Sequence, residues 1–496
     1  MNVICTFTVK FTATIFRDIR QRNPMNYFNQ SIRTVSMRKL ILVLCLSLTT
    51  AMFASAQEVE VITLEDAIQV ALEKNINLLQ AANNLQRNDA EVLRATGDFL
   101  PNLNLTGGAS RTVGRQFNQA TISFEEFTNN SINANLSGGL ILFNGLQNIN
   151  NLRAARSGRS SAQDEFKRAR ENVIFSTASA YLQVLLDKEL ITIARENLEA
   201  STRQLEQITA QVEVGMRPIV DQFNQEAIVA NNELDVITRE NNLNLNTTRL
   251  ISILQIDPLK DYDFVVPEVS DYDLDPNVYS LTDLVQTALA NRSDLSGQEF
   301  RIMAARYALS SARGNYLPTL SLNASISTRY FDTYREPEIG PNGVPTGQRV
   351  TVGFGDQFFD RGINRQIGLN LNFPLFTRFQ NRTFEQQRRI DLKNAELQLE
   401  SLQSDVFLEV RQAYNDYSTI SKQLQATQKA LIAAEKAYET EQERYRVGSS
   451  TLIELTRANS EFVSAASNRV QTVYRFIFQE KLLDFYLGQI SEDVRL

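Results

Sequence analysis

The sequence has 496 residues, with 50 Lys and Arg against 57 Asp and Glu, and a formal net charge of −7. It contains no His and no Trp, and both of its cysteines, Cys5 and Cys45, stand near the N-terminus. This composition excludes histidine general-base catalysis and the commonest zinc ligand, and the acidic balance argues against a nucleic-acid partner.

The N-terminus shows the pattern of an export signal. A charged segment, Met37-Arg38-Lys39, precedes an apolar core over residues 40–48, and Ala54-Ser55-Ala56 fits the small-x-small cleavage rule. We expect a signal peptide over residues 37–56 and a mature chain from Gln57. Residues 1–36 are then a mistaken or disordered extension before the true start. An uncleaved anchor is the weaker alternative, because a spanning helix needs ~20 apolar residues.

After the signal, the mature chain has no cysteine, which suits an oxidising compartment. It also lacks any continuous apolar run long enough to cross a bilayer, so the sequence predicts no transmembrane helix. If this exported chain enters a membrane, a closed β-barrel is the form left to it, because every backbone polar group in lipid must be paired.

Residues 57–256 form a first predicted repeat of helices and strands. Its two strands alternate apolar residues with Asn, Ser, Thr and Gly, and a polar loop over 111–131 joins them. The predicted elements are helices at 63–75 and 77–97, strands at 102–111 and 132–143, a long helix at 147–213 and a return helix that ends near Leu254.

Residues 257–279, which contain three prolines, form a predicted connector, and residues 280–490 form a second repeat before a short tail at 491–496. A long loop over 329–365 with strong turn residues joins the strands of this repeat. The predicted elements are helices at 280–291 and 294–314, strands at 319–328 and 366–376, a long helix at 380–446 and a return helix that ends near Leu487.

The two repeats are copies of each other. Leu64 to Leu105 reads again from Leu281 to Leu322, and Phe143, Asn148 and Gly215 recur as Phe376, Asn381 and Gly448. The later pairs are spaced more widely along the chain than the earlier ones, so the extra residues of the second copy lie between its strands. A period this long indicates a duplicated half-domain rather than a solenoid of short repeats.

Each predicted strand has about ten residues, the length that crosses a bilayer when tilted. The polar positions are small and uncharged, which favours a wet lumen over a soluble sheet, the alternative. Each long helix would be about 100 Å long at 1.5 Å per residue, and its spacing of Ile174, Ala178, Tyr181 and Leu185 is typical of a coiled-coil seam.

Matched glycine turns end the long helices. Val214-Gly215-Met216-Arg217-Pro218 follows the first, and Val447-Gly448-Ser449-Ser450-Thr451 follows the second. Gly is suited to the left-handed residue after a helix, and Pro218, or Thr451 with Glu454 as a capping box, opens the return helix.

Four strands cannot close a barrel, and an open sheet edge does not occur in lipid. The chain must therefore form an oligomer, with eight strands from two copies or twelve from three. Eight strands leave an interior filled by side chains, whereas twelve or more leave an aqueous passage, and the sequence alone leaves this choice open.

Over residues 60–490 the sequence resembles the TolC-type outer membrane efflux protein family. The shared features are the order of elements, the duplication and the twin Val-Gly turns. They also include the Leu-Pro strand starts (Leu100-Pro101 and Leu317-Pro318) and the Leu-Phe strand ends (Leu142-Phe143 and Leu375-Phe376). The resemblance implies a mainly α protein with a membrane β-barrel: four strands per chain, and a homotrimer with a twelve-stranded barrel and an α-helical periplasmic tunnel. It also implies a location in the outer membrane, in contact with its lipid and extending into the periplasm.

By this resemblance, the chain exports small molecules such as drugs as the outer component of a tripartite efflux system. Its partners would be a periplasmic adaptor (membrane fusion) protein and, through it, an inner-membrane pump of the RND or ABC type. Two alternatives are the outer component of a type I protein secretion system and, from another class, a soluble periplasmic coiled-coil structural protein. We expect no enzyme activity, no cofactor and no metal site.

The resemblance also assigns roles to residues at the turns. Those implied to contact the adaptor are Val214, Gly215, Met216, Val447, Gly448 and Ser449. Those implied to form a periplasmic gate are Asp221, Tyr445, Glu454 and Arg457. Three copies of Glu454 would ring the axis and give cation preference and a pH-dependent gate, as charged rings do in other channels.

Two features qualify these assignments. Asp221 and Glu454 both lie in the first turn of a helix, where the macrodipole favours an acidic residue anyway. The sequence also departs from the family pattern, because Ser450 stands where a latch arginine is expected and Arg457 where a second acidic ring is expected. We expect Arg457 to pair with Glu454, three residues earlier on the same helix.

Overall fold

The computed structural model describes residues 60–119, 121–265 and 276–490. The predicted signal peptide, the segment before it and the tail at 491–496 lie outside the described residues, as does the 266–275 part of the connector. In the described part of the chain, no helix combines the length and the apolar character needed to cross a membrane.

The two repeats fold into the same order of elements. The first contains α3 (Leu64–Lys74), α4 (Ile76–Gly97), β2 (Asn102–Asn118), β3 (Ser123–Asn144), α5 (Gln147–Glu213) and α6 (Ile219–Leu254). The second contains α7 (Leu281–Asn291), α8 (Ser293–Gly314), β5 (Thr319–Phe331), β8 (Asn364–Asn372), α10 (Gln380–Arg446) and α11 (Leu452–Tyr486). The long helices α5 and α10 have 67 residues each, over the ranges that the absence of proline predicts.

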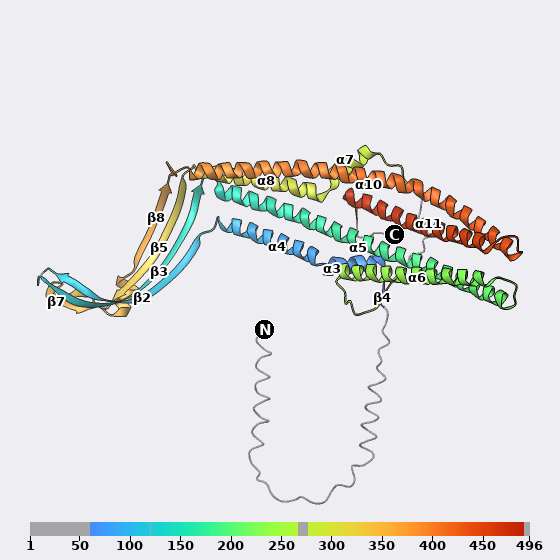
Figure 1. Ribbon diagram of the computed structural model, residues 1–496. Coiled ribbons are helices and arrows are strands. Elements are labelled where there is room, and N and C mark those ends of the chain that lie inside the picture. The colour runs from blue at the N-terminus through green and yellow to red at the C-terminus, as the bar shows by residue number, and fades with distance from the viewer. Residues whose placement is uncertain (1–59, 120, 266–275, 491–496) are drawn as a thin grey trace, which may run out of the picture. The chain divides into compact units, whose positions relative to one another are not determined.

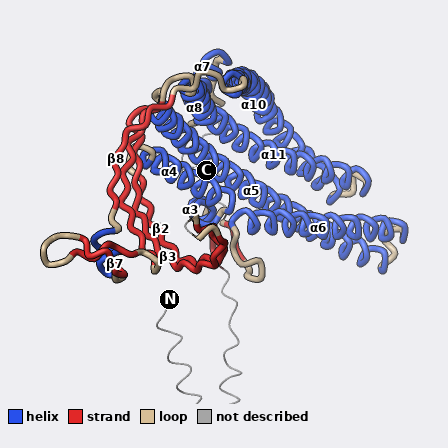
Figure 2. The backbone as a smooth tube through the Cα atoms, turned by 90° about the vertical axis from the view of Figure 1, so that its left-hand side faces the viewer, coloured by secondary structure: helices blue, strands red, loops and turns tan. Residues whose placement is uncertain are grey.

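The strands form one antiparallel sheet in the order β2-β3-β5-β8, with the β3–β5 pair at the boundary between the repeats. Figure 2 shows these strands side by side, with the helices continuing from one end of the sheet. Within the described residues, β2 and β8 each have one unpaired edge. The sheet of a single chain is therefore open at both sides.

The prediction of a loop over residues 111–131 is wrong, because β2 and β3 stay paired as far as Asn118 and Ser123. Cross-strand contacts hold this outer part of the hairpin. The Ser110 and Ser131 hydroxyls lie 2.8 Å apart, and the Phe117 and Phe124 rings meet edge to face at 5.3 Å. Such pairs stabilise a hairpin whose residues are too polar to show apolar alternation.

The predicted loop over residues 329–365 also contains regular structure. It forms a separate hairpin of β6 (Arg335–Ile339) and β7 (Pro345–Thr351), followed by the short helices α9 (Phe354–Asp356) and η2 (Gln357–Arg361). Strand β8 ends at Asn372, before the predicted end at Phe376. Pro374 lies just beyond it, and proline has no N–H to donate to a sheet.

Apolar side chains on the sheet are exposed in the single chain. Leu103 and Leu105 on β2 are 74% and 76% exposed, and Ile367, Leu369 and Leu371 on β8 are 76%, 68% and 67% exposed. An apolar surface of this kind on a protein marks contact with a membrane or a partner. Both edge strands contribute to it.

The helices that continue the strands lie in the same order, α4-α5-α8-α10 (Figure 1). Arg159 of α5 is ion-paired with Asp89 of α4, and Asp164 of α5 accepts a 2.7 Å hydrogen bond from Ser296 of α8. Arg313 of α8 is 3.1 Å from Glu385 of α10. The outer helices of this layer, α4 and α10, are the ones that connect to the edge strands β2 and β8.

The core also contains a small pair of parallel strands that was not predicted from the sequence. Strand β1 (Glu60–Ile62) pairs with β4 (Tyr262–Phe264). The buried Tyr181 of α5 donates its hydroxyl hydrogen bond to the Ile62 carbonyl at 3.0 Å or the Val265 carbonyl at 2.9 Å. One side chain thus links the start of the first repeat and the start of the connector to the long helix α5.

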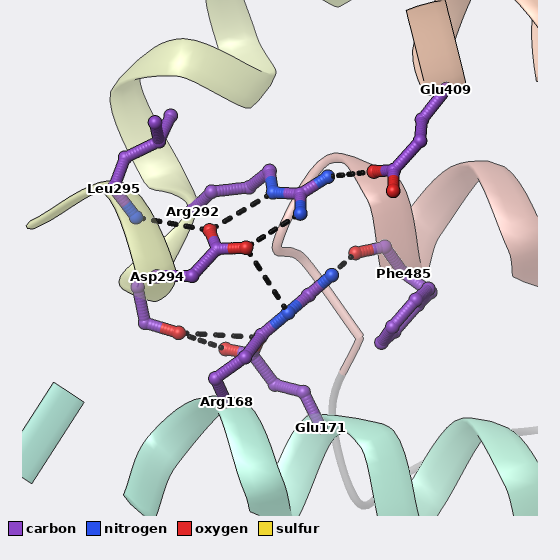
Figure 3. Close-up of polar contacts among 8 residues, drawn as sticks. Arg168, Glu171, Arg292, Asp294, Leu295, Glu409 and Phe485 are labelled. Atoms are coloured by element: carbon purple, nitrogen blue, oxygen red, sulfur yellow. Dashed lines mark hydrogen bonds and ion pairs between the residues drawn. The ribbon is translucent and has the colours of Figure 1, made fainter. Parts of the chain in front are cut away.

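A buried ionic cluster joins the two repeats where α7 meets α8 (Figure 3). Arg292 lies 2.6 Å from Asp294 and 2.5 Å from Glu409 of α10, and its side chain is 3% exposed. Arg168 of α5 lies 3.0 Å from Glu171 and 3.7 Å from Asp294. Helices of both repeats therefore meet through one set of paired charges.

The same cluster holds the end of α11. Arg168 donates a 3.3 Å hydrogen bond to the Phe485 carbonyl, and its guanidinium carbon lies 4.1 Å from the centre of the Phe485 ring. That ring stacks on Phe175 of α5 at 4.6 Å. The C-terminal helix is thereby anchored to the first repeat by charge and by aromatic packing.

Candidate functional site at the two glycine turns

The turns that end α5 and α10 have nearly the same backbone geometry. Gly215 has φ +79° and Gly448 has φ +76°. Met216 N–H donates to the Gln211 carbonyl at 2.8 Å, and Ser449 N–H donates to the Arg444 carbonyl, also at 2.8 Å. This six-to-one bond with a left-handed glycine is the Schellman C-cap, and it turns the chain sharply into the return helix.

The residues that the sequence assigned to adaptor contact all lie at these turns and project from the helix ends. Val214, Met216 and Val447 are 69%, 76% and 70% exposed. A Cβ added to Gly215 or Gly448 would meet no atom within 4 Å. Each turn therefore presents an apolar side chain beside an open glycine.

Two of the predicted gate residues, Asp221 and Tyr445, both contact the side chain of Arg217. The Arg217 guanidinium carbon lies 4.8 Å from the centre of the Tyr445 ring, and its Nη1 lies 3.3 Å from the Asp221 carboxylate. Gln204 of α5 donates a 3.3 Å hydrogen bond to the Tyr445 hydroxyl. Burial raises the pKa of Tyr445, so its ring stays neutral over the physiological range.

Arg217 and Gln204 were not predicted as gate residues. A signal for Arg217 was present, because aligning Gly215 with Gly448 places it opposite Ser450, the position where the sequence departs from the family pattern. Gln204 gave no such signal, since a glutamine on a long polar helix face is ordinary.

Glu454 lies apart from this group and caps α11. Its carboxylate accepts hydrogen bonds from Thr451 N–H at 2.9 Å and from the Ser450 hydroxyl at 3.0 Å, and its own N–H donates to Thr451 Oγ1 at 3.3 Å. The predicted capping box is confirmed. The hydrogen bond from the Thr451 backbone, followed by those from the two hydroxyls, lowers the pKa of Glu454.

The expected ion pair between Arg457 and Glu454 is wrong. Arg457 Nε lies 3.1 Å from Glu461 Oε1, four residues further along α11. The helix terminus explains this choice, because the Glu454 carboxylate is already held by N–H and hydroxyl groups at the cap. Glu454 thus keeps its full negative charge on an exposed helix end.

Nothing in the described ranges suggests a resident metal at these turns or elsewhere. Over residues 60–119, 121–265 and 276–490, no three acidic side chains are grouped so that they could hold a metal ion. The chemistry available at the turns is hydrogen bonding, charge and apolar contact.

An open sheet with an exposed apolar surface, continued by two very long helices that turn back at matched glycines, defines a class of duplicated outer membrane conduit proteins. The sequence pattern described as "Outer membrane efflux protein" matches residues 67–254 and 284–489. The chain belongs to this outer membrane efflux protein family, and its place is the outer membrane.

Individual relatives agree with this membership. The chain is 24% identical to the outer membrane protein TolC of Escherichia coli (strain K12) over 465 residues, 92% of this chain and 87% of TolC. It is 24% identical over 430 residues to the pyoverdine export outer membrane protein OpmQ of Pseudomonas aeruginosa, 82% of this chain and 81% of OpmQ.

Solved structures share the fold. The CusC structure superposes with a TM-score of 0.72 at 18% identity, over 86% of this chain and 92% of CusC. The CmeC outer membrane channel of Campylobacter jejuni gives the same TM-score and identity over 87% of each chain.

Proposed function

We propose that three copies of this chain form a channel that carries small molecules, such as drugs and other toxic compounds, out of the cell as the outer part of a tripartite efflux system. The observation that carries the proposal is the open sheet, with unpaired edges on β2 and β8 and exposed leucines on both strands. In lipid, such edges must pair with other copies. Twelve strands from three copies leave room for an aqueous passage.

The two glycine turns are the proposed docking surface for a periplasmic adaptor protein, which connects the channel to an inner-membrane pump. Val214, Met216 and Val447 offer exposed apolar contacts, and Gly215 and Gly448 leave the neighbouring backbone open to close approach. A helical hairpin with apolar residues at its end would fit such a surface. The pump and adaptor, rather than this chain, would select the substrate.

Asp221, Tyr445, Glu454 and Arg457 are the proposed gate residues near the turns. Arg217 would hold the closed arrangement by contacting Asp221 and Tyr445 together. Three copies of Glu454 near the axis would favour cations. In the single chain the hydrogen bonds of the helix cap, that of the Thr451 backbone first, hold the pKa of Glu454 below its ordinary value, so each copy would bring a charged carboxylate to the axis at neutral pH.

Reconstitution of the purified protein in a planar lipid bilayer tests the channel. We expect discrete conductance steps with cation selectivity, and a clear loss of selectivity for Glu454→Gln with the steps retained. Glu233→Gln, an exposed carboxylate on the other return helix α6, is the matched control and is expected to leave selectivity near that of the unsubstituted protein. Absence of conductance from well-folded protein would reject the channel, whereas unchanged selectivity in Glu454→Gln would reject the charged ring alone.

Adaptor docking needs a separate measurement, because it concerns the outside of the turns. Met216→Glu and Val447→Glu place charges on the apolar contacts and are expected to reduce export in cells that depend on this chain. The same variants are expected to keep normal bilayer conductance. Reduced export with an equal loss of conductance would indicate a damaged channel instead of a damaged docking surface.

A further inference from the structure

The apolar face of the four-stranded sheet contains a groove. One row of paired residues crosses all four strands as Leu103, Gly138, Ala324 and Ile367, so that two small residues lie between two large ones. The Leu103 side chain leans over Gly138, because a Cβ added there would lie 2.9 Å from Leu103 Cδ2. The small residues leave a hollow of about 320 Å³ that is lined mainly by apolar side chains, and we call it the sheet groove.

One end of the sheet groove carries a positive charge. The next row away from the long helices contains Leu136, Ile326 and Arg365. Arg365 lines the groove and lies on the same face of β8 as Ile367, because side chains alternate along a strand. The long helices continue the sheet into the periplasm, so the row of Arg365 is on the side of the groove toward the cell exterior (Figure 2).

The guanidinium of Arg365 lacks a partner of opposite charge. Over residues 60–119, 121–265 and 276–490 it makes no hydrogen bond or ion pair. The two edge strands, β2 and β8, contain no acidic residue that could reach it when a barrel closes. A cation on the lipid side of a membrane sheet is costly unless an anion or water reaches it. An anionic group at the outer end of an apolar groove would satisfy this arginine.

Further toward the exterior, aromatic rings cover the same face of β5. We call Tyr330, Phe354, Phe358 and Phe359 the aromatic platform. The Phe354 ring meets Tyr330 edge to face at 5.1 Å and stacks on Phe358, also at 5.1 Å. Tyr330 lies on the same face of β5 as Ile326, four residues earlier. Phe359 is 68% exposed, so the platform presents an aromatic ring beyond the charged end of the groove.

Polar contacts hold the aromatic platform against the sheet. Gln357, which is 4% exposed, donates a 3.1 Å hydrogen bond to the Phe331 carbonyl and accepts one from Phe331 N–H. The Thr328 hydroxyl donates to the Phe358 carbonyl. Strand β8 pairs with β5 only as far as Ser327, so the Gln357 side chain replaces the strand partner that Phe331 lacks on that side. The platform is therefore fixed to the wall that carries the groove.

We propose that this face binds a phosphorylated glycolipid of the outer leaflet, with an acyl chain in the sheet groove, a phosphate on Arg365 and sugar rings against the aromatic platform. Arginine forms paired, charge-assisted hydrogen bonds with phosphate oxygens, and aromatic rings offer a large apolar surface to the apolar faces of sugars. A phospholipid would use the groove and the arginine but not the platform. The inference rests on the proposed channel only in requiring that the apolar face of the sheet is turned toward lipid.

Native mass spectrometry of the detergent-purified protein tests the site, with bis-phosphorylated lipid A and phosphatidylglycerol as the added lipids. We expect lipid A to bind about ten times more tightly than phosphatidylglycerol. Arg365→Gln removes the cation and Ala324→Leu fills the groove, so each is expected to weaken lipid A binding about tenfold. Phe359→Ser is expected to weaken lipid A binding and leave phosphatidylglycerol binding unchanged. Arg329→Gln is the matched control, because Arg329 is exposed on the opposite face of β5.

Bilayer conductance of the same samples separates this inference from the proposed channel. We expect the Arg365, Ala324 and Phe359 variants to keep the conductance steps of the unsubstituted protein. Equal binding of the two lipids would overturn the glycolipid, and unchanged lipid A binding in Arg365→Gln would overturn the phosphate contact. In either case, conductance that persists would leave the proposed function standing. Selective lipid A binding that Arg365→Gln weakens, in a protein without conductance, would support this site and reject the channel.

Discussion

The buried cluster around Arg292 and the contacts around Tyr445 both join the first repeat to the second, but they differ in burial. The Arg292 side chain is 3% exposed, whereas those of Arg217 and Asp221 are 24% and 29% exposed. Removing one partner of a buried ion pair costs several kcal/mol, but an accessible pair contributes about 1 kcal/mol or less. At the turns, the contacts that cross between the repeats are the Arg217–Tyr445 cation–π contact and the Gln204–Tyr445 hydrogen bond, each contributing about 1 kcal/mol. The repeats are therefore held more firmly at the Arg292 cluster than at the turns.

The ionisation of the buried cluster is consistent with this difference. Burial by itself would lower the pKa of Arg292, but its hydrogen bonds to Asp294 and Glu409 outweigh burial and raise it. Burial would likewise raise the pKa of Asp294, but Arg292 lowers it overall. Both groups are thus held in their charged forms inside the protein.

The largest expected effect comes from removing the central cation. Arg292→Met keeps much of the side-chain volume but leaves Asp294 and Glu409 without their partner, so we expect the free energy of unfolding to fall by about 3–5 kcal/mol. Denaturant unfolding of the detergent-solubilised protein, followed by circular dichroism, measures it. Arg313→Met, which breaks a more exposed pair with Glu385, is the control. A loss below about 1 kcal/mol for Arg292→Met would show that the buried cluster does not hold the repeats together more strongly than an exposed ion pair does.

Acid is expected to act on the same cluster more gradually. The folded-state pKa of Asp294 is below its ordinary value of 3.8, so its contribution to stability is present above that pH and is lost as the pH falls through the folded-state pKa. We expect unfolding midpoints to be flat from pH 8 to pH 5 on this account and to fall below about pH 4. In Asp294→Asn the acid-dependent part of the fall should shrink, and an unchanged acid profile would show that other carboxylates dominate it.

A smaller effect is expected at the turns. Arg217→Ala removes the cation over Tyr445 and the partner of Asp221, a loss of about 1 kcal/mol. Hydrogen exchange should therefore become faster near the turns, with the middle of α5 unchanged, and bilayer conductance should rise if the contact holds the closed arrangement. Arg446→Ala is the matched control, because its ion pair with Glu443 is exposed. Global destabilisation by Arg217→Ala would show that the turns are not the weak region.

The smallest effect is expected from alanine substitution of single glycines, and the test is whether stability rises or falls at each position. Gly215→Ala places a side chain at φ +79°, which we expect to cost about 1 kcal/mol. Gly158→Ala lies inside α5, where the nearest atom to the new Cβ is 3.5 Å away, and should stabilise the helix by up to about 1 kcal/mol. Unfolding midpoints of the two variants should therefore move in opposite directions, and a shared direction would contradict the assigned turn geometry.

Local signals in the sequence located the helices well and the strands partly. The long helices occupy Gln147–Glu213 and Gln380–Arg446, since proline is absent there and glycine supplies the C-caps. The outer half of the β2–β3 hairpin was missed, because Phe117, Phe124 and their neighbours are stabilised by cross-strand pairing and show no apolar alternation.

The sequence predicted where the candidate site lies, but it did not predict which side chains contact one another there. Both turns and the capping box of Glu454 follow from neighbouring residues, so the sequence identifies them. The partner of Arg457 could be Glu454 or Glu461 by spacing alone, and the structure places it at Glu461 because the first carboxylate already caps the helix. The group around Tyr445 joins residues up to 241 positions apart, for which no local pattern exists.

The sequence by itself determined the duplicated order of elements, the length of the helices and the position of the turns, because these depend on backbone propensities and hydrogen bonds between near neighbours. Tertiary structure alone decided how the repeats are joined: the cluster of Arg168, Arg292 and Glu409, and the strand pair held by Tyr181. These features depend on which distant side chains exclude water together, and burial of that kind exists only once the chain has folded.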